Sequence, residues 1–522
     1  MMSEDFILVN DVGTTGTRAI IYDRNAGVIA ESYSELPQVF PKPGWTEQDP
    51  VGIYEKCVEV TREALKSAGV GPEQILAMGI ATQRTTSMLW DRNTGEPVYN
   101  AITWQDTRMS DECERINRSL YFKSLHVIGG AFQGVASLSK SLKRNALGKM
   151  LITAAHFTIT PAMSSAHARW LLDNVEGAAE KARAGDLLFG TVDTWLLWNY
   201  TGGKTHATDF SNVSATGMYD PFQMKWSTEL MKPFKLPGDL VLPEIRETSG
   251  DFGTTDVFGH PIPIKCVVAD QQAALFGEAC FEVGSVKCTN GTGTFIDMNT
   301  GDEPVASVHK MTPMIAWKMR GETTYMLEGI ISSAGSSIQF LRDNLKLIKE
   351  AAESESLALS TDDTGGVYVV PAFTGLSAPY WDPFARGTVI GLTRATTREQ
   401  VVRATLESIA YQCKDVVAAM EKDTGIRVCD IKADGGASQN DFLLQFLADI
   451  LDTDVERPEI LEATALGAAY FAGIAAGIWE FPDDILRIRG VEREFKPDMP
   501  SETRGSLYAG WKKAVGRAQH WA

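Results

Sequence analysis

Two glycine- and threonine-rich segments, one in each half of the chain, repeat one local pattern. Residues 11–17 (DVGTTGT) come after the apolar run at 7–9, and residues 290–294 (NGTGT) come after the strand-like segment at 286–288 (VKC). A second apolar run follows each segment, so each predicts a tight turn between two strands. Glycine permits close approach, and consecutive amides with threonine hydroxyls form a concave array of donors for an anion. Two such turns indicate a protein that grips a polyphosphate, and therefore a nucleotide.

The repeated pattern also indicates two domains. At 522 residues the chain is longer than one hydrophobic core usually supports. Strand-like and helix-like segments alternate in both halves, which is typical of a layered α/β fold. A stretch rich in Pro, Gly, Thr and Asp at 243–263 predicts a hinge. We therefore expect an N-terminal domain over 1–255 and a C-terminal domain over 256–522.

Three helices are predicted in the second half. Apolar residues recur at helical spacing from Arg398 to Met420, and Thr397 with Gln400 has the pattern of a capping box. A second apolar helix is expected over 442–451. A third begins near Ala463 and is rich in small residues, which predicts close packing beside a sheet or a ligand.

The charge and the cysteines exclude several classes of protein. A net charge of −18 argues against general binding to nucleic acids or anionic membranes, because both would repel the chain. The seven cysteines are scattered without a C-x-x-C pair, so neither a disulfide framework nor a zinc site is indicated. The first residues lack a signal-peptide pattern, and no apolar run is long enough to span a bilayer. We therefore expect a cytoplasmic protein.

Further clusters carry polar groups that suit catalysis or binding. Asp270 and Gln271 stand where an apolar strand ends and an apolar helix begins, so Asp270 is either a helix cap or a general base. The glycine pair at 435–436 predicts a strand-to-helix turn that lets a base or a ribose lie against bare backbone. Arg84 follows a strand and reaches either a substrate or a surface carboxylate. Trp104 suits either the carbon face of a polyol or plain packing.

Together with these clusters, four motifs make the chain similar to the glycerol kinases of the FGGY family of carbohydrate kinases. They are residues 41–45 (PKPGW), 190–196 (GTVDTWL), 373–383 (FTGLSAPYWDP) and 387–407, which reads like the family's second signature. The resemblance covers essentially the whole chain. It implies an α/β fold of two actin-like, hexokinase-like (ribonuclease H-like) ATPase domains around a central cleft. It also implies ATP and Mg²⁺ as cofactors and the transfer of a phosphoryl group to an alcohol.

The resemblance implies roles for individual residues as well. Asp270 would be the catalytic base, and Asp11 would lie near the magnesium ion. Contacts to ATP would come from the two turns and an adenosine pocket: Thr14, Thr15, Arg18, Thr292 with Gly291 and Gly293, Gly335, Ile338, Gln339, Gly436 and Asn440. The acceptor polyol, glycerol in the first instance, would be held by Arg84, Thr85, Trp104, Asp270, Gln271 and Phe295. Family members often form dimers or tetramers, but this sequence carries no recognisable interface signal.

Two departures from the family pattern concern the acceptor. Glycerol kinases typically have Gln-Arg-Glu-Thr where this chain has QRTT at 83–86, so Thr85 replaces a carboxylate that accepts hydrogen bonds from glycerol. A charge-assisted bond contributes about 1.5–3 kcal/mol, so its loss predicts glycerol binding weaker by roughly ten- to a hundredfold. Where the family has an aromatic residue and a lysine, this chain has PAMSSAH at 161–167, with Ala162 at the aromatic position.

Extra residues intervene in the segment 117–160. They include four basic residues between leucines: Lys140, Lys143, Arg144 and Lys149. Such a pattern is typical of either a solvated surface helix or a basic face that docks a partner or a membrane surface.

Three hypotheses on function stay open. The first is an ATP-dependent glycerol kinase. The second is a kinase for another polyol, triose or ketose, which the small side chains of Thr85 and Ala162 would admit. The third is a nucleotide-gated regulatory protein with weak turnover, against which the presence of Asp11, Asp270 and Thr292 argues.

Overall fold

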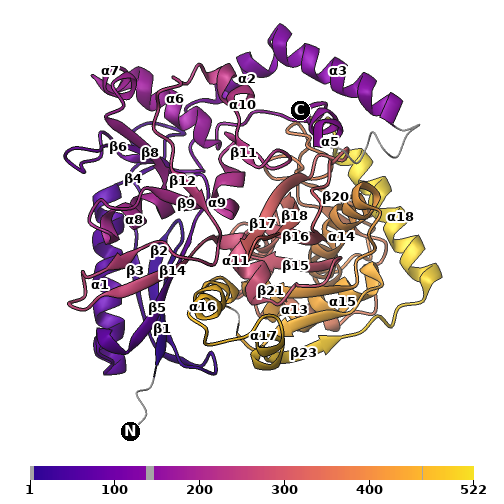
Figure 1. The fold of residues 1–522 in the computed structure, drawn as a ribbon. Coiled ribbons are helices and arrows are strands. Elements are labelled where there is room, and N and C mark those ends of the chain that lie inside the picture. Colours follow the sequence, from indigo (N-terminus) through magenta and orange to yellow (C-terminus); the bar gives the residue numbers. More distant parts are fainter. Residues whose placement is uncertain (1–4, 137–145, 461) are drawn as a thin grey trace.

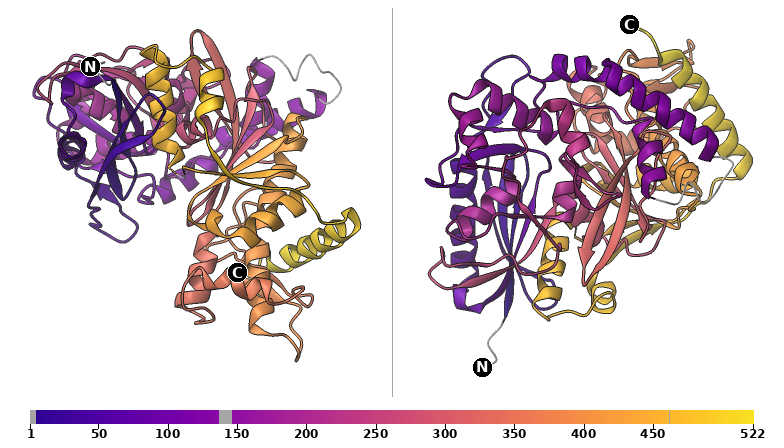
Figure 2. Two further views of the ribbon diagram at one scale, coloured as in Figure 1. Left: turned by 90° about the horizontal axis from the view of Figure 1, so that it is seen from below. Right: turned by 45° about the horizontal axis from the view of Figure 1, so that its top comes forward.

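The computed structural model describes residues 5–136, 146–460 and 462–522, and they form two α/β domains (Figure 1). The indigo-to-magenta part of the chain builds one body and the salmon-to-yellow part builds the other, with α11 (Asp270–Gly277) and α16 (Ala463–Ala475) between them. Seen from below, the C-terminal body extends away from the N-terminal one (Figure 2). The expected two-domain α/β class is confirmed.

The first sheet is built around the first predicted turn. Strands β1 (Phe6–Val12) and β2 (Gly16–Tyr22) pair antiparallel, and β1 pairs in parallel with β5 (Ile75–Thr82). Its six strands run in the order β13-β14-β5-β1-β2-β3, completed by β3 (Val28–Glu35), β13 (Thr254–Thr255) and β14 (Ile262–Ala269). The side chains of β1 and β5 are almost all buried, as expected for a parallel pair covered on both faces.

The second sheet repeats the first. Strands β15 (Ser285–Asn290) and β16 (Thr294–Gly301) form the second predicted hairpin, and β15 pairs in parallel with β21 (Asp430–Asp434). Its order is β17-β18-β16-β15-β21-β22-β23, completed by β17 (Thr312–Met319), β18 (Glu322–Ile331), β22 (Val455–Pro458) and β23 (Val491–Phe495). The two sheets have the same strand order when the first is read from β3 and the second from β18. Each begins with an antiparallel strand, continues through the two strands of the hairpin and two strands that pair in parallel, and ends with an antiparallel edge strand. The duplication indicated by the two turns therefore extends to whole sheets.

Smaller sheets complete the two domains. Four strands run in the order β4-β7-β6-β8: β4 (Glu47–Gln48), β7 (Ala101–Ile102), β6 (Ser87–Asp91) and β8 (Leu187–Thr191). Three two-stranded sheets pair β9 (Ala207–Asp209) with β12 (Glu244–Arg246), β10 (Tyr219–Asp220) with β11 (Lys225–Trp226), and β19 (Tyr368–Val370) with β20 (Thr388–Ile390).

Helices surround the sheets. In the N-terminal part they are α1 (Pro50–Ala68), α2 (Ser110–Asn117), α3 (Leu120–Ala136), α5 (Ala146–Ala154), α6 (Ser164–Asn174), α7 (Ala178–Arg183), α8 (Val192–Tyr200), α9 (Phe210–Ala215) and α10 (Thr228–Met231). In the C-terminal part they are α12 (Gly335–Asp343), α13 (Glu353–Leu359), α14 (Arg398–Thr424), α15 (Asp441–Leu451), α17 (Asp483–Ile488) and α18 (Ser501–Ala518). The three predicted helices are confirmed as α14, α15 and α16, and Thr397 and Gln400 form the expected capping box.

The pairing of β14 bears on the expected domain boundary at 255/256. Strand β14 follows residue 256, yet it pairs with β5 in the first sheet. A division at 255/256 would separate β14 from that sheet. We propose instead that the boundary falls after α11, which directly follows β14 and ends at Gly277.

Helix α16 packs against α11 and against the first sheet, through its small residues. A Cβ on Gly467 would lie 1.8 Å from the carbonyl oxygen of Ala273, and a Cβ on Gly277 would lie 2.2 Å from that of Ala463. Each helix therefore carries a glycine that lets the two backbones touch. The close packing predicted for this segment is confirmed.

Gly467→Ala is expected to destabilise the protein by about 1–3 kcal/mol, because the added methyl group forces two backbones apart. Gly516→Ala on α18 is the matched control, since a Cβ there meets nothing within 4 Å. The control is expected to be neutral or stabilising by about 0.5–1 kcal/mol. Urea unfolding of both variants measures the difference, and equal midpoints would contradict this account of the α11–α16 contact.

The extra segment at 117–160 contributes helices α3 and α5, which pack on each other along the top of the view in Figure 1. Lys149 of α5 pairs with Glu303 of the C-terminal domain, with 3.1 Å between Nζ and Oε2. The segment therefore contacts both domains. Lys140, Lys143 and Arg144 lie outside the described residues, so the choice between a surface helix and a docking face stays open. Among the described helices none is both long and apolar enough to cross a membrane.

Candidate active site

The first hairpin presents a short polar loop that other elements hold in place. The amide of Gly13 donates to the carbonyl of Gly16 at 2.9 Å and closes the turn. Thr14 accepts two further bonds, from Trp104 Nε1 to its Oγ1 and from Gln48 Nε2 to its carbonyl, both 2.8 Å long. Thr15 beside it is exposed. Hydrogen bonds thus hold the loop in its turn conformation, and the Thr15 side chain is exposed at its tip, as a phosphate-binding turn requires.

Asp11 and Arg18 face each other across the hairpin, because they are paired in the register of β1 and β2. Burial raises the pKa of Asp11 to about 7, Arg18 opposes that rise, and Asp270 and Glu462 add to it. Arg18 Nη1 is 2.6 Å from an oxygen of Glu462. The hairpin therefore holds a carboxylate whose charge is only partly compensated.

A magnesium ion fits this carboxylate. Among the described residues no three His, Cys, Asp or Glu side chains are arranged to hold a metal ion. Mg²⁺ bound with a nucleotide needs only one or two carboxylates, since phosphates and waters supply its other ligands. A divalent cation would also keep Asp11 ionised. We propose Asp11 as the protein ligand.

The second hairpin is enclosed by two glycine turns. The amides of Ala334 and Ser336 donate to the carbonyl of Thr292 at 3.1 and 3.0 Å, and a Cβ on Gly335 would lie 2.5 Å from the carbonyl oxygen of Gly291. On the other side, a Cβ on Gly435 would lie 2.7 Å from the carbonyl oxygen of Asn290. Only residues without side chains allow this approach, so the structure brings together three segments that are far apart in sequence.

The residues expected in the adenosine pocket divide into two groups. Gly436 borders open space and Gln339 is exposed, so a ligand can reach both. Thr292, which was expected to contact the phosphates rather than the adenosine, is exposed as well. Ile338 is only 6% exposed and belongs to the hydrophobic core, and the amide of Asn440 is engaged as the cap of α15, accepting from Leu443 N at 2.9 Å. Ile338 and Asn440 therefore support the residues around them. A direct contact of either with adenosine stays a prediction.

Asp270 opens α11 at the end of β14, at the junction of the two domains. Its Oδ1 accepts a hydrogen bond from Gln271 N at 2.7 Å, and Ala269 rather than Asp270 occupies the cap position. Burial raises the pKa of Asp270, and Arg84 opposes the rise. The side chain keeps 28% exposure. A partly exposed carboxylate of raised pKa suits proton acceptance better than it suits capping.

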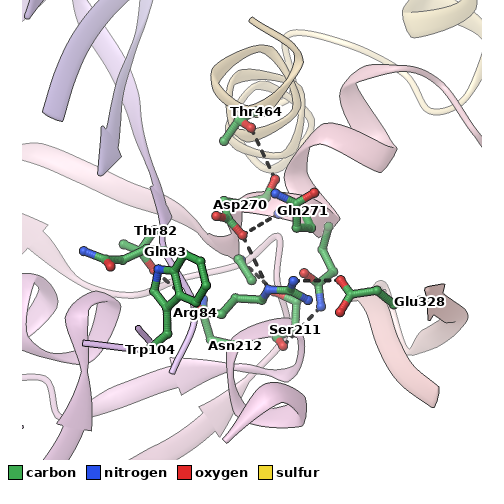
Figure 3. A network of polar contacts seen from close by, with 12 residues as sticks. Thr82, Gln83, Arg84, Trp104, Ser211, Asn212, Asp270, Gln271, Glu328 and Thr464 are labelled. Atoms are coloured by element: carbon green, nitrogen blue, oxygen red, sulfur yellow. Dashed lines mark hydrogen bonds and ion pairs between the residues drawn. The ribbon is translucent and has the colours of Figure 1, made fainter. Parts of the chain in front are cut away.

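Arg84 lies between two carboxylates, as Figure 3 shows. Its Nε is 3.6 Å from Asp270 Oδ1, and its Nη2 is 2.7 Å from Glu328 Oε2. The guanidinium carbon lies 5.8 Å from the ring centre of Phe295. The surface salt bridge considered from sequence is therefore excluded, because the Arg84 side chain is only 12% exposed.

Gln271 is oriented by a buried ion pair. Lys287 Nζ donates to Gln271 Oε1 at 2.6 Å and lies 2.8 Å from Asp297 Oδ2, and the side chains of Lys287 and Asp297 are fully buried. Because the lysine occupies the amide oxygen, the amide nitrogen of Gln271 is left to donate to a ligand.

Three residues of this arrangement were not predicted from sequence: Lys287, Asp297 and Glu328. The sequence offered one signal for them, since each is a charged residue within an otherwise strand-like segment. Their partners lie on other strands, so the pattern alone could not assign them.

Thr85 has a backbone φ of 61°, which is a strained conformation for a β-branched residue. Its carbonyl accepts hydrogen bonds from Ser87 Oγ and from Ser164 Oγ, the latter at 2.9 Å. Ser164 belongs to residues 161–167, so that segment does meet Thr85. His167 of the same segment is fully buried, and burial lowers its pKa to about 4. A neutral histidine therefore stands where the family pattern has lysine.

Paired hairpins on duplicated sheets, with a partly exposed carboxylate and a buried arginine at their junction, define the class: a two-domain kinase of the actin-like, hexokinase-like fold. The chain belongs to the FGGY family of carbohydrate kinases. The family's N-terminal domain matches residues 6–140 and 133–277, and its C-terminal domain matches residues 286–476. The N-terminal match consists of two parts, which overlap at 133–140 within the extra segment. It ends at Gly277, the residue after which we propose the boundary.

Known proteins of this family resemble the chain over its full length. It is 47% identical over 519 residues to a glycerol kinase of Caldanaerobacter subterraneus, and 46% identical over 518 residues to glycerol kinase 2 of Thermotoga maritima, covering 99% of both sequences in each case. Among solved structures, Plasmodium falciparum glycerol kinase with ADP superposes with a TM-score of 0.89 at 31% identity, covering 99% of this chain and 98% of that one.

Proposed function

We propose that this protein is an ATP-dependent glycerol kinase, which transfers the γ-phosphoryl group of ATP to glycerol and forms sn-glycerol 3-phosphate. The observation that carries the proposal is the position of Asp270 beside Arg84, at the junction between two hairpins of phosphate-binding type. Full-length similarity to glycerol kinases of two bacteria supports it. We also propose that the enzyme is cytoplasmic, as expected from its sequence.

The chemistry requires alignment of the reactants and removal of a proton. A primary alcohol is a weak nucleophile, and the attacked phosphate is anionic, so positioning and charge screening carry most of the catalysis. Asp270 accepts the hydroxyl proton as the bond from the hydroxyl oxygen to the γ-phosphorus forms and the bond from that phosphorus to the leaving ADP breaks. Arg84 and the amide of Gln271 hold the hydroxyl groups, and Trp104 and Phe295 border the carbon chain. The two hairpins hold the phosphates through Thr14, Thr15, Arg18 and Thr292.

A magnesium ion, when bound with the nucleotide at Asp11, supplies charge compensation to the phosphates. Gly436 and Gln339 would contact the adenosine, and the open space at Gly436 and the exposure of Gln339 support this role. Exclusion of water from the junction matters because water competes with the alcohol for the phosphoryl group.

A second candidate function is phosphorylation of a larger polyol, a triose or a ketose. The observation that favours it is Thr85, which is smaller than the family's glutamate and uncharged. An acceptor screen decides between them: ADP formation is followed with glycerol, dihydroxyacetone, tetroses, pentuloses and heptuloses. We expect the highest kcat/KM with glycerol. A higher value for another acceptor would establish the second function, and no stimulation by any acceptor would favour the nucleotide-gated regulatory protein.

Thr85→Glu is expected to lower the KM for glycerol by about tenfold or more, because a carboxylate adds a charge-assisted hydrogen bond to the acceptor. The left-handed backbone at position 85 tolerates an unbranched side chain better than threonine, so the fold is not expected to suffer. Thr85→Gln is the control, with the same shape and no charge. Equal KM values for glycerol in Thr85→Glu and wild type would show that position 85 does not contact the acceptor.

A further inference from the structure

Arg84 extends from the N-terminal domain into the sheet of the C-terminal domain. It follows β5 of the first sheet, while its guanidinium contacts three strands of the second. Nη2 lies 2.7 Å from Glu328 on β18, Nη1 lies 3.5 Å from Met314 Sδ on β17, and the Phe295 ring of β16 is 5.8 Å away. The side chain that would hold the acceptor is therefore itself held by the other domain.

Glu328 is a buried carboxylate whose charge is compensated by Arg84. It is directly opposite Asp297 in the register of β16 and β18, so both carboxylates lie on one face of the sheet. The Glu328 side chain is 5% exposed and the Asp297 side chain is fully buried. Lys287 compensates Asp297, which leaves Arg84 as the cation of Glu328. Removing either member of such a buried pair leaves an uncompensated charge.

We propose that Glu328 is a positioning residue for the acceptor: from the C-terminal domain it holds the guanidinium of Arg84 so that Nε faces Asp270 and the substrate hydroxyls. The inference rests on the proposed function. Its consequence is that the acceptor site is complete only when the two domains are apposed. With a neutral residue at 328, the guanidinium of Arg84 is free to move toward Asp270, whose Oδ1 lies 3.6 Å from Nε. Arg84 and Asp270 would then pair with each other and be less available to the acceptor.

Glu328→Gln tests this role, because the amide keeps the shape and removes the charge. We expect the KM for glycerol to rise at least tenfold and kcat to fall, while the KM for ATP stays within about twofold of the wild-type value. Glu328→Asp keeps the charge on a shorter side chain and is expected to give intermediate KM values. Thermal unfolding of each variant shows whether it folds. If Glu328→Gln does not fold, Glu328→Asp alone provides the test.

Glu303→Gln is the matched control, since it removes another ion pair between the domains, that with Lys149. It is expected to leave both KM values unchanged. If Glu328→Gln raises the KM for ATP as much as the KM for glycerol, the Arg84–Glu328 ion pair is merely structural. The same conclusion holds if Glu303→Gln has the same effects as Glu328→Gln. An unchanged KM for glycerol in a folded Glu328 variant would also overturn the inference. Wild-type turnover of glycerol is measured first: without it the proposed function fails, whereas turnover with an unaffected variant refutes only the role of Glu328.

Discussion

Replacing Asp270 with asparagine is expected to lower kcat with glycerol by about 10²–10⁴-fold, because the amide cannot accept the proton of the attacking hydroxyl. Nucleotide affinity should change little, since the hairpins at Thr14 and Thr292 do not depend on Asp270 for their geometry. Steady-state kinetics and calorimetric titration with ATP measure the two effects. Turnover close to wild type would refute the assignment of the base.

The pH dependence of kcat provides a second measurement on the same variant. Burial raises the pKa of Asp270 above its ordinary value, with Arg84 acting against the rise. Protonated Asp270 cannot serve as a base, so wild-type kcat is expected to fall as the pH falls through this raised pKa. The residual activity of Asp270→Asn should lack that decline. The same acidic decline in both proteins would assign it to another group.

Lys287→Met is expected to destabilise the protein by about 3–5 kcal/mol, because it leaves the fully buried carboxylate of Asp297 without its cation. The same change removes the hydrogen bond that orients Gln271, so any folded variant should also bind glycerol more weakly. The free energy of unfolding in urea measures the first effect and the KM for glycerol the second.

The double variant Lys287→Met with Asp297→Leu is the control. It replaces the whole pair with apolar side chains of similar size, which is often nearly neutral for stability. We expect it to recover most of the lost stability while glycerol binding stays weak, because Gln271 still lacks its partner. Stability as low as in the single variant would show that the uncompensated charge is not the cause.

Features that depend on local sequence were predictable. The two hairpins follow from the apolar runs on either side of a glycine turn, and α14 begins where the pair Thr397 and Gln400 predicts it. The small residues of α16 predicted close packing, and the contact of Gly467 with α11 has that character. In each case the determining residues lie within a few positions of one another.

Features that depend on distant pairing were not predictable to the same degree. Strand β14 pairs with β5, although many helices and short strands separate the two along the chain. Because of this pairing we propose a later boundary than 255/256. The charged residues Lys287 and Glu328 lie within largely buried strands, and no neighbouring residue in the sequence indicates their partners. Their meaning appears only when β15, β16 and β18 lie side by side and Arg84 reaches them from the other domain. Compensation of buried charge between strands leaves no local pattern.

The central claim is that the junction beside Asp270 passes a phosphoryl group to a primary hydroxyl of glycerol. Phosphorus NMR of the wild-type protein with ATP, Mg²⁺ and glycerol tests it most directly. The account predicts a phosphomonoester signal that grows in equal amount with ADP and corresponds to sn-glycerol 3-phosphate. ADP accompanied only by inorganic phosphate, or no ADP at all, would contradict it.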